Sequence, residues 1–224
     1  MKYYHAYEDR YKKVHAERGK PWAGERPSTI LKDLLVKYGA TENSSILEVG
    51  CGEGQNALYL MKEGFSVDAS DVSPEAISWC KKWANERGLN ADKFFVMDAC
   101  ENDFQGEYDF IYSVAVLHML VEDEDRHKFL TFIKNHLKEN GHAFVVVMGD
   151  GKTSYRSGTK EAFDLADRPF EDSIIQVATT SCRKVTWEEF FAELKLAGFK
   201  VVNHYLDHSI SGFDVSMVAE LVRE

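Results

Sequence analysis

The stretch that decides the fold is Ser45-Ile46-Leu47-Glu48-Val49-Gly50-Cys51-Gly52-Glu53-Gly54. Its apolar first half predicts a buried strand, and its glycines predict a loop that leads into a helix. Glu48 stands at the end of that strand, and Asp71 and Asp98 stand at the ends of the next two predicted strands. Because parallel strands end at the same edge of a sheet, the three carboxylates should meet in one crevice. A crevice lined with acids suits a cofactor that carries positive charge and free hydroxyls.

Strands and helices are predicted to alternate along most of the chain. This alternation predicts an α/β fold with a doubly wound, Rossmann-like, mostly parallel seven-stranded sheet. The predicted strands cover 46–49, 65–70, 94–97, 110–117, 143–148, 199–206 and 215–222. The predicted helices cover 28–38, 55–63, 73–87, 124–138 and 186–198, with one more helix in the first segment, and three are expected to be capped by Ser28, Ser73 and Thr186. The last two strands are expected to form an antiparallel hairpin at the sheet edge.

Composition and charge narrow the class of protein. The chain has 224 residues, a formal net charge of -10 and no long basic block, so nucleic acid is not expected as a partner. No apolar stretch is long enough to span a bilayer and no signal peptide is visible, so a cytoplasmic protein is expected. The four cysteines form no C-x-x-C pair, which favours reduced thiols over a zinc site or disulfides. No metal is expected, and the sequence does not indicate an oligomeric state.

The glycines alone leave two classes of cofactor open. Read from Gly52, the loop gives Gly52-x-Gly54-x-x-Ala57, which also fits the pattern of dinucleotide-binding proteins. The acids discriminate better, because Glu48 would repel a diphosphate beside the loop but would attract an amino group or a sulfonium. Asp71 can accept hydrogen bonds from ribose hydroxyls in either class. Asp98 could accept one from an adenine amino group.

Five groups of residues carry a resemblance to a known family. Glu48-x-Gly50-x-Gly52-x-Gly54, Asp71-Val72-Ser73 and Asp98-Ala99 are similar to the successive cofactor motifs of class I S-adenosylmethionine-dependent methyltransferases. Tyr108-Asp109-Phe110-Ile111, running to Leu117-His118, resembles the fourth-strand motif of that family, and Gly141 before 143–147 resembles its lead-in to strand five. The resemblance extends from Ile46 to about Met148 and continues weakly beyond.

The resemblance implies S-adenosylmethionine as the cofactor and a set of residues that would bind it. Glu48 and the backbone of Gly50 and Gly52 would hold the methionine amino end. Asp71 would bind the ribose, and Val72 would pack on the adenine. The other members of the implied set lie at the adenine edge (Asp98, Ala99), beside the methionine moiety (Ser113, Val114), in the glycine loop and first helix (Cys51, Gly54, Asn56) and in the N-terminal segment (Tyr11, Trp22).

Two parts of the chain are expected to cover the site. Residues 1–40 are predicted to form an N-terminal helical lid on a methyltransferase domain over 41–224. Glu8-Asp9-Arg10-Tyr11, Trp22 and Pro27-Ser28 resemble the lid of small-molecule methyltransferases of the thiopurine and tellurite type. An aromatic helix face packed on the sheet is the alternative. The stretch 149–184 is long for a connection, so a substrate-covering insertion is expected there.

The expected function is transfer of a methyl group from S-adenosylmethionine to a small-molecule acceptor by in-line displacement. Protein methylation stays open, and so does an NAD(P)-dependent oxidoreductase on a similar fold, although Glu48 and Asp98 argue against it. His118 follows the fourth strand, where the family places substrate. It is either a general base, because an unperturbed histidine titrates near physiological pH, or a residue that only shapes the pocket.

Overall fold

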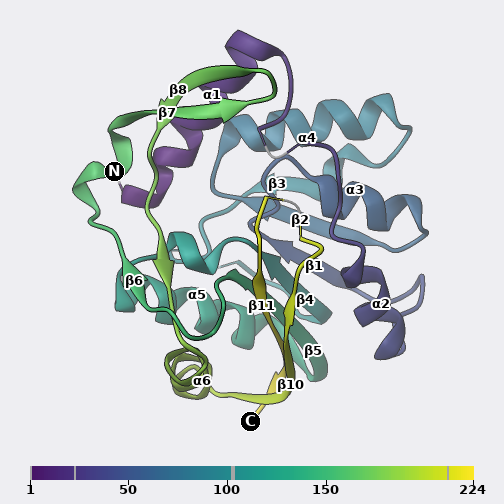
Figure 1. Ribbon diagram of the computed structural model, residues 1–224. Coiled ribbons are helices and arrows are strands. Elements are labelled where there is room, and N and C mark those ends of the chain that lie inside the picture. Colours follow the sequence, from purple (N-terminus) through teal and green to yellow (C-terminus); the bar gives the residue numbers. More distant parts are fainter. Residues whose placement is uncertain (1, 23, 102–103, 211) are drawn as a thin grey trace.

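The computed structural model describes residues 2–22, 24–101, 104–210 and 212–224, and it contains a central sheet between layers of helices (Figure 1). The strands of this sheet are β1 Ile46–Val49, β2 Val67–Asp71, β3 Phe94–Val96, β4 Tyr108–Val114, β5 Leu137–Met148, β10 Phe199–Asp207 and β11 Ser216–Arg223. They lie in the order β10-β11-β5-β4-β1-β2-β3. Strands β1 to β5 pair in parallel, whereas β11 is antiparallel to both β5 and β10. The predicted α/β fold with an antiparallel edge hairpin is confirmed.

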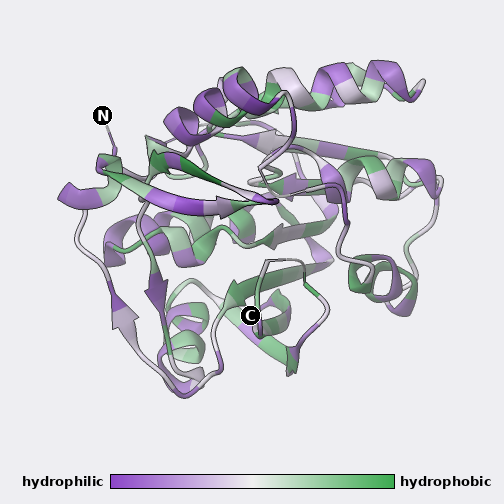
Figure 2. Ribbon diagram, turned by 45° about the horizontal axis from the view of Figure 1, so that its top comes forward, coloured by the Kyte–Doolittle hydropathy of each residue, from purple (hydrophilic) through white to green (hydrophobic). Residues whose placement is uncertain are grey.

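Helices cover both faces of the sheet because each strand has apolar residues on both faces. The helices are α1 Ala6–Arg18, α2 Ile30–Lys37, α3 Gln55–Lys62, α4 Pro74–Glu86, α5 Asp123–His136 and α6 Trp187–Leu196. Leu47 belongs to the core under α5 and α6, whereas its neighbour Ile46 belongs to the core under α2, α3 and α4. The helices carry both hydrophobic and hydrophilic segments (Figure 2), as helices that cover a sheet do.

Two of the predicted helix starts are confirmed by their caps. Ser73 Oγ accepts a hydrogen bond from the N–H of Ala76 at 3.0 Å, and α4 begins with Pro74, which has no N–H to leave unpaired. Thr186 and Glu189 form a reciprocal capping box at the start of α6. Local side-chain chemistry therefore sets both starts.

The predicted Ser28 cap is wrong. Thr29 is the N-cap residue of α2, and no side-chain cap is formed there. The N–H of Ser28 instead donates to Asn56 Oδ1 at 2.8 Å. The start of α2 is therefore held by α3, through a contact between segments far apart in the sequence.

The fourth strand ends earlier than predicted, at Val114 rather than at 117. Ala115 has φ 61°, in the left-handed region, so the extended chain breaks there and a single 3-10 turn, Leu117–Met119, follows. The Arg126 guanidinium holds this turn through hydrogen bonds from Nη1 to the carbonyls of Leu117 at 2.6 Å and Leu120 at 3.1 Å. His118 consequently lies on a turn beyond the strand.

The boundary between α5 and β5 also differs from the prediction. α5 ends at His136 rather than at 138, and β5 begins at Leu137 rather than at 143. Leu137 pairs with Tyr108 of β4, and Lys138 forms an ion pair with Asp109 at 2.8 Å. These contacts with the neighbouring strand draw the chain into an extended conformation that its local pattern did not indicate.

The stretch 149–184 carries short elements of its own, β6 Tyr155–Arg156, β7 Leu165–Phe170, β8 Ser173–Ala178 and β9 Arg183–Lys184. β7 and β8 form an antiparallel hairpin that lies beside α1 (Figure 1). Val14 of α1 packs there against Phe170, Ile175 and Val177, with Trp22 at the edge of the cluster. The N-terminal segment and the late hairpin therefore form one layer.

Candidate active site

A cavity of about 740 Å³ lies where β1, β2 and β4 end. Its walls come from the glycine loop, the strand ends, the N-terminal segment and the stretch 149–184. The predicted site residues that line it are Glu48, Gly50, Cys51, Gly52, Asn56, Asp71, Val72, Asp98, Ala99, Val114, His118, Tyr11 and Trp22. Its size falls in the range of small-molecule and cofactor sites, roughly 300–1,000 Å³.

Two predicted site residues, Gly54 and Ser113, do not line the cavity. Gly54 has φ 86°, and a Cβ there would lie 2.9 Å from Cys80 Sγ. The glycine therefore lets α3 begin close against α4. Ser113 is buried within β4, and its hydroxyl has no hydrogen-bond partner among the residues that the structure describes. A role of either residue toward the cofactor stays a prediction.

Glu48 is 1% exposed and accepts hydrogen bonds at 3.1 Å from both Asn56 Nδ2 and the Tyr112 hydroxyl. Burial raises the pKa of its carboxyl to about 8, in spite of these two donors. At neutral pH the side chain is therefore mostly protonated in the ligand-free protein. A positive group placed beside it would favour the ionised form.

Asp71 organises the glycine loop. One carboxylate oxygen accepts the N–H of Gly52 at 2.8 Å, and the other accepts the N–H of Ser73 at 2.9 Å. Burial raises the pKa of this carboxyl to about 6. A carboxylate has about four acceptor sites, so the oxygens can accept further hydrogen bonds on the cavity side.

Asp98 lies two residues beyond the end of β3, and the N-terminal segment contacts it. The Tyr4 hydroxyl donates to Asp98 Oδ2 at 3.0 Å, and His5 Nε2 lies 3.4 Å from the same oxygen. The N–H of Cys100 donates to Oδ1 at 2.9 Å. The N-terminal segment thus reaches the same carboxylate that the sequence placed at the adenine edge.

A buried histidine ties α1 to the glycine loop. His15 Nε2 lies 2.8 Å from Glu53 Oε1, and its Nδ1 lies 2.8 Å from Glu75 Oε1 in the first turn of α4. The imidazole also stacks on Trp79, with 4.2 Å between ring centroids. Burial lowers the pKa of His15, but the hydrogen bonds to the two carboxylates outweigh burial and leave this pKa raised.

Sequence reasoning missed both ends of this contact. Glu53 is 1% exposed and also accepts the N–H of Trp22 at 2.7 Å. The acid between Gly52 and Gly54 was a signal of a contact with another segment, since nothing in the loop itself required a carboxylate. His15 follows Tyr11 by four residues, on the helix face that the aromatic spacing identified.

His118 lines the cavity in a neutral state. The side chain is 4% exposed and its ring meets the Phe213 ring edge-on, 5.3 Å between centroids. Burial, with the nearby charges of Arg126 and Lys184, lowers the pKa of this histidine to about 3. The Nδ1 atom has no hydrogen-bond partner among the described residues. His118 therefore lacks the near-physiological pKa on which its interpretation as a general base depended.

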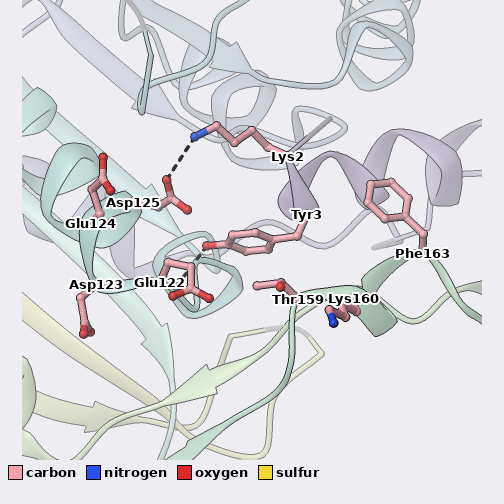
Figure 3. Close-up of a pocket in the computed structure, with 9 residues that line it drawn as sticks. All are labelled: Lys2, Tyr3, Glu122, Asp123, Glu124, Asp125, Thr159, Lys160 and Phe163. Atoms are coloured by element: carbon pink, nitrogen blue, oxygen red, sulfur yellow. Dashed lines mark hydrogen bonds and ion pairs between the residues drawn. The ribbon is translucent and has the colours of Figure 1, made fainter.

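A second hollow, of about 660 Å³, lies between the N-terminal residues and the start of α5 (Figure 3). The Tyr3 hydroxyl accepts the N–H groups of Val121 and Glu122 at 3.0 and 3.2 Å, and Lys2 Nζ lies 3.6 Å from Asp125. Its other acids, Glu122, Asp123 and Glu124, also have cationic partners. This hollow therefore marks the place where the N-terminal residues dock on α5.

The described residues contain neither a metal-binding cluster nor a helix that could span a membrane. Across 2–22, 24–101, 104–210 and 212–224, no group of three or more histidine, cysteine or acidic side chains could hold a metal ion. Over the same ranges, no helix has the length and apolar character needed to cross a bilayer.

Comparison with known proteins identifies the central part of the chain. A family model described as a methyltransferase domain matches residues 46–141. The chain is 33% identical over 102 residues to a 2-heptyl-1-hydroxyquinolin-4(1H)-one methyltransferase of Mycobacteroides abscessus. The alignment covers 45% of this chain and 44% of that protein. It is 29% identical over 101 residues to a probable S-adenosyl-L-methionine-dependent methyltransferase, TehB, of Haemophilus influenzae. That alignment covers 45% of this chain and 35% of that protein. The chain thus aligns with less than half of either relative.

The solved structures agree with this over almost the whole length. The CcbJ methyltransferase of Streptomyces caelestis superposes with a TM-score of 0.72 at 15% identity, covering 97% of this chain and 98% of that one. At this identity the likeness shows the fold alone. The matched family model identifies residues 46–141 as a methyltransferase domain, and the motifs within it and the sheet order are similar to those of class I S-adenosylmethionine-dependent methyltransferases.

Proposed function

We propose that this chain binds S-adenosylmethionine in the cavity of about 740 Å³ and catalyses transfer of its methyl group to a small-molecule acceptor. The observation that carries the proposal is that Glu48, Asp71 and Asp98 all line this one cavity at the strand ends. Acidic groups beside the glycine loop fit a cationic nucleoside and disfavour a diphosphate at that place. The matched relative from Mycobacteroides abscessus is named for a small-molecule acceptor, which supports the same class of substrate here.

The residues present fit such a cofactor. Glu48 would accept the methionine ammonium, and its buried, protonated state in the ligand-free protein is what a site awaiting a cation would show. Asp71 would accept the ribose hydroxyls while it keeps the N–H groups of Gly52 and Ser73. Val72, Asp98 and the other cavity-lining residues of the predicted set would contact the adenine end and the methionine moiety.

The bound cofactor supplies an activated methyl group on a sulfonium. The protein's task is to hold the acceptor in line with the departing sulfur and to keep water out. His118 would accept a hydrogen bond from an acceptor N–H, O–H or S–H at an unprotonated ring nitrogen, since it is neutral. A strong base is not required for an acceptor that is already nucleophilic.

The N-terminal segment over 1–40 and the stretch 149–184 would act as the cover of this site. Their supporting contacts are His15 with Glu53 of the glycine loop, Tyr4 with Asp98, and the packing of α1 on the β7–β8 hairpin. All three join the covering layer to residues at or beside the proposed cofactor site. Opening would have to break the buried imidazole–carboxylate contacts first.

Replacing His15 by alanine is expected to lower the free energy of unfolding by about 2–3 kcal/mol, because the buried Glu53 carboxylate loses its contact with the imidazole. The raised pKa of folded His15 means that this contribution is complete below pH 6.5, its ordinary value, and is lost as pH rises through the higher folded value. The Tm difference from wild type should therefore shrink from acidic to alkaline pH. His127→Ala, at an exposed histidine of α5, is the matched control and should show neither effect. A His15→Ala difference that grows with pH would contradict this linkage.

Binding of S-adenosylhomocysteine at about pH 7 is expected to release close to one proton from Glu48, because the ligand's ammonium favours the ionised carboxyl. Calorimetric titrations in phosphate and in Tris, which differ in ionisation enthalpy, measure that release. Glu48→Gln should bind more weakly and release no proton from this site. Equal binding enthalpies of the wild type in the two buffers would refute the role given to Glu48.

Turnover tests the catalytic part of the proposal. The protein is incubated with S-adenosylmethionine and a panel of small thiols, amines, hydroxyl compounds and metalloid oxyanions, and S-adenosylhomocysteine formation is measured. Formation that depends on one acceptor supports the proposal. Cofactor binding without turnover on any acceptor would favour a binding module with the same fold.

A further inference from the structure

Side chains of both charges line the cavity. The strand ends and the glycine loop contribute the carboxyl groups of Glu48, Glu53, Asp71 and Asp98. The N-terminal segment and the stretch 149–184 contribute three guanidinium groups, those of Arg10, Arg26 and Arg168. None of the three forms an ion pair with a carboxylate among the residues that the structure describes. These two segments therefore bring positive charge to the cavity wall without an ion-pair partner.

Arg10 is the most informative of these side chains, because it is only 5% exposed. Its Nε and Nη2 atoms donate to the carbonyls of Ala178 and Thr179 and to Thr180 Oγ1, at 2.5–3.1 Å. All these partners are uncharged. The Nη1 atom donates no hydrogen bond to any described residue, so one edge of the guanidinium is left for a ligand.

A buried cation without an anion is unfavourable, since buried charges in proteins are normally paired. Burial lowers the pKa of Arg10, and the charge of Arg168 acts in the same direction. No carboxylate is among the charges that act on this group. The wall would gain most from a bound anion, because charge-assisted hydrogen bonds are about twice as strong as neutral ones.

Two aromatic rings hold Arg10 at the cavity wall. Its guanidinium carbon lies 4.9 Å from the centre of the Tyr7 ring and 4.8 Å from the centre of the Trp22 ring. Both aromatic residues line the cavity, and the cation lies over a face of each ring. These contacts fix the guanidinium in place, where the anionic group of a ligand could pair with it.

We propose that the methyl acceptor is a small molecule with a carboxylate or phosphonate-type oxyanion, which binds Arg10 and Arg168. The inference rests on the proposed function, because it assigns the carboxyl groups beside the glycine loop to the cofactor. In this arrangement the arginines hold the anion of the acceptor, and the carboxyl groups hold the cation of the cofactor. These two sets of groups would thereby orient the two ligands relative to each other.

The probes for the test are benzoate, phenylphosphonate and the neutral benzamide, titrated at fixed salt into protein saturated with S-adenosylhomocysteine. We expect at least one of the two anions to bind about tenfold or more tightly than benzamide, and the comparison of the two anions shows which oxyanion fits. Arg168→Gln, at an exposed position, should lower the affinity for that anion about tenfold and leave benzamide unchanged. Arg10→Gln should abolish the preference for the anion over benzamide. Arg18→Gln is the matched control and should keep that preference. Arg18 also lies on α1 and donates to a β8 carbonyl, but it does not line the cavity.

The outcomes separate the two proposals. In one case the protein binds S-adenosylhomocysteine and yet binds neither anion more tightly than benzamide, or binds no anion at all. Either result overturns the anionic acceptor and leaves the proposed function standing. An Arg168→Gln variant that keeps the full preference for the anion over benzamide has the same meaning. A protein that does not bind S-adenosylhomocysteine overturns the proposed function and this inference with it.

Discussion

Gly50→Ala is expected to destabilise the protein far more than Gly39→Ala, although both glycines have φ 78°. At Gly39 a Cβ would meet nothing within 4 Å, so only backbone strain of about 1–2 kcal/mol is added. At Gly50 the Cβ would lie 2.2 Å from Val116 Cγ2, and overpacking adds about 1–3 kcal/mol to the same strain. The pair therefore isolates the steric role of Gly50.

Urea unfolding of the two variants measures this difference. The Gly50→Ala variant should also lose affinity for S-adenosylhomocysteine, because relief of the clash must move the loop or the residues after β4. Gly39→Ala should bind like the wild type. Equal losses of stability in the two variants would show that the approach of Val116 to the glycine loop is not close in solution.

Asp71→Ala is expected to weaken binding of S-adenosylhomocysteine by about 2–4 kcal/mol, because ribose hydroxyls would lose a charged acceptor. The structure adds a second cause, since the N–H groups of Gly52 and Ser73 lose their acceptors in the same variant. Asp68→Ala is the control: it lies on the same strand, pairs with Lys93 at 2.7 Å and does not line the cavity. Calorimetry gives both dissociation constants. An unchanged constant in Asp71→Ala would contradict the role given to that carboxylate.

The sheet and the strand-end acids were predictable because their signals are local. Ile46–Val49 is an apolar run closed by glycines, and Ser73-Pro74 caps the following helix, so neither needs knowledge of distant residues. The end of β4 was not predictable in this way. Its apolar pattern continues to 117, but the left-handed Ala115 and the carbonyls bound by Arg126 end the strand earlier.

The contacts that the N-terminal segment makes with the glycine loop and with the stretch 149–184 were the least predictable part of the site. His15 meets Glu53 across 38 positions of sequence, and Arg10 meets Ala178 across 168. Such contacts leave no periodic pattern, because each depends on where two unrelated segments are placed by the rest of the fold. The aromatic spacing of the first helix indicated only which face would be buried.

The most direct test of the central claim is one calorimetric comparison on the wild-type protein, with S-adenosylhomocysteine and NAD titrated under identical conditions. The carboxyl groups at the strand ends predict saturable binding of the sulfur nucleoside and no binding of the diphosphate-containing NAD. Tight binding of NAD with no response to S-adenosylhomocysteine would contradict the account.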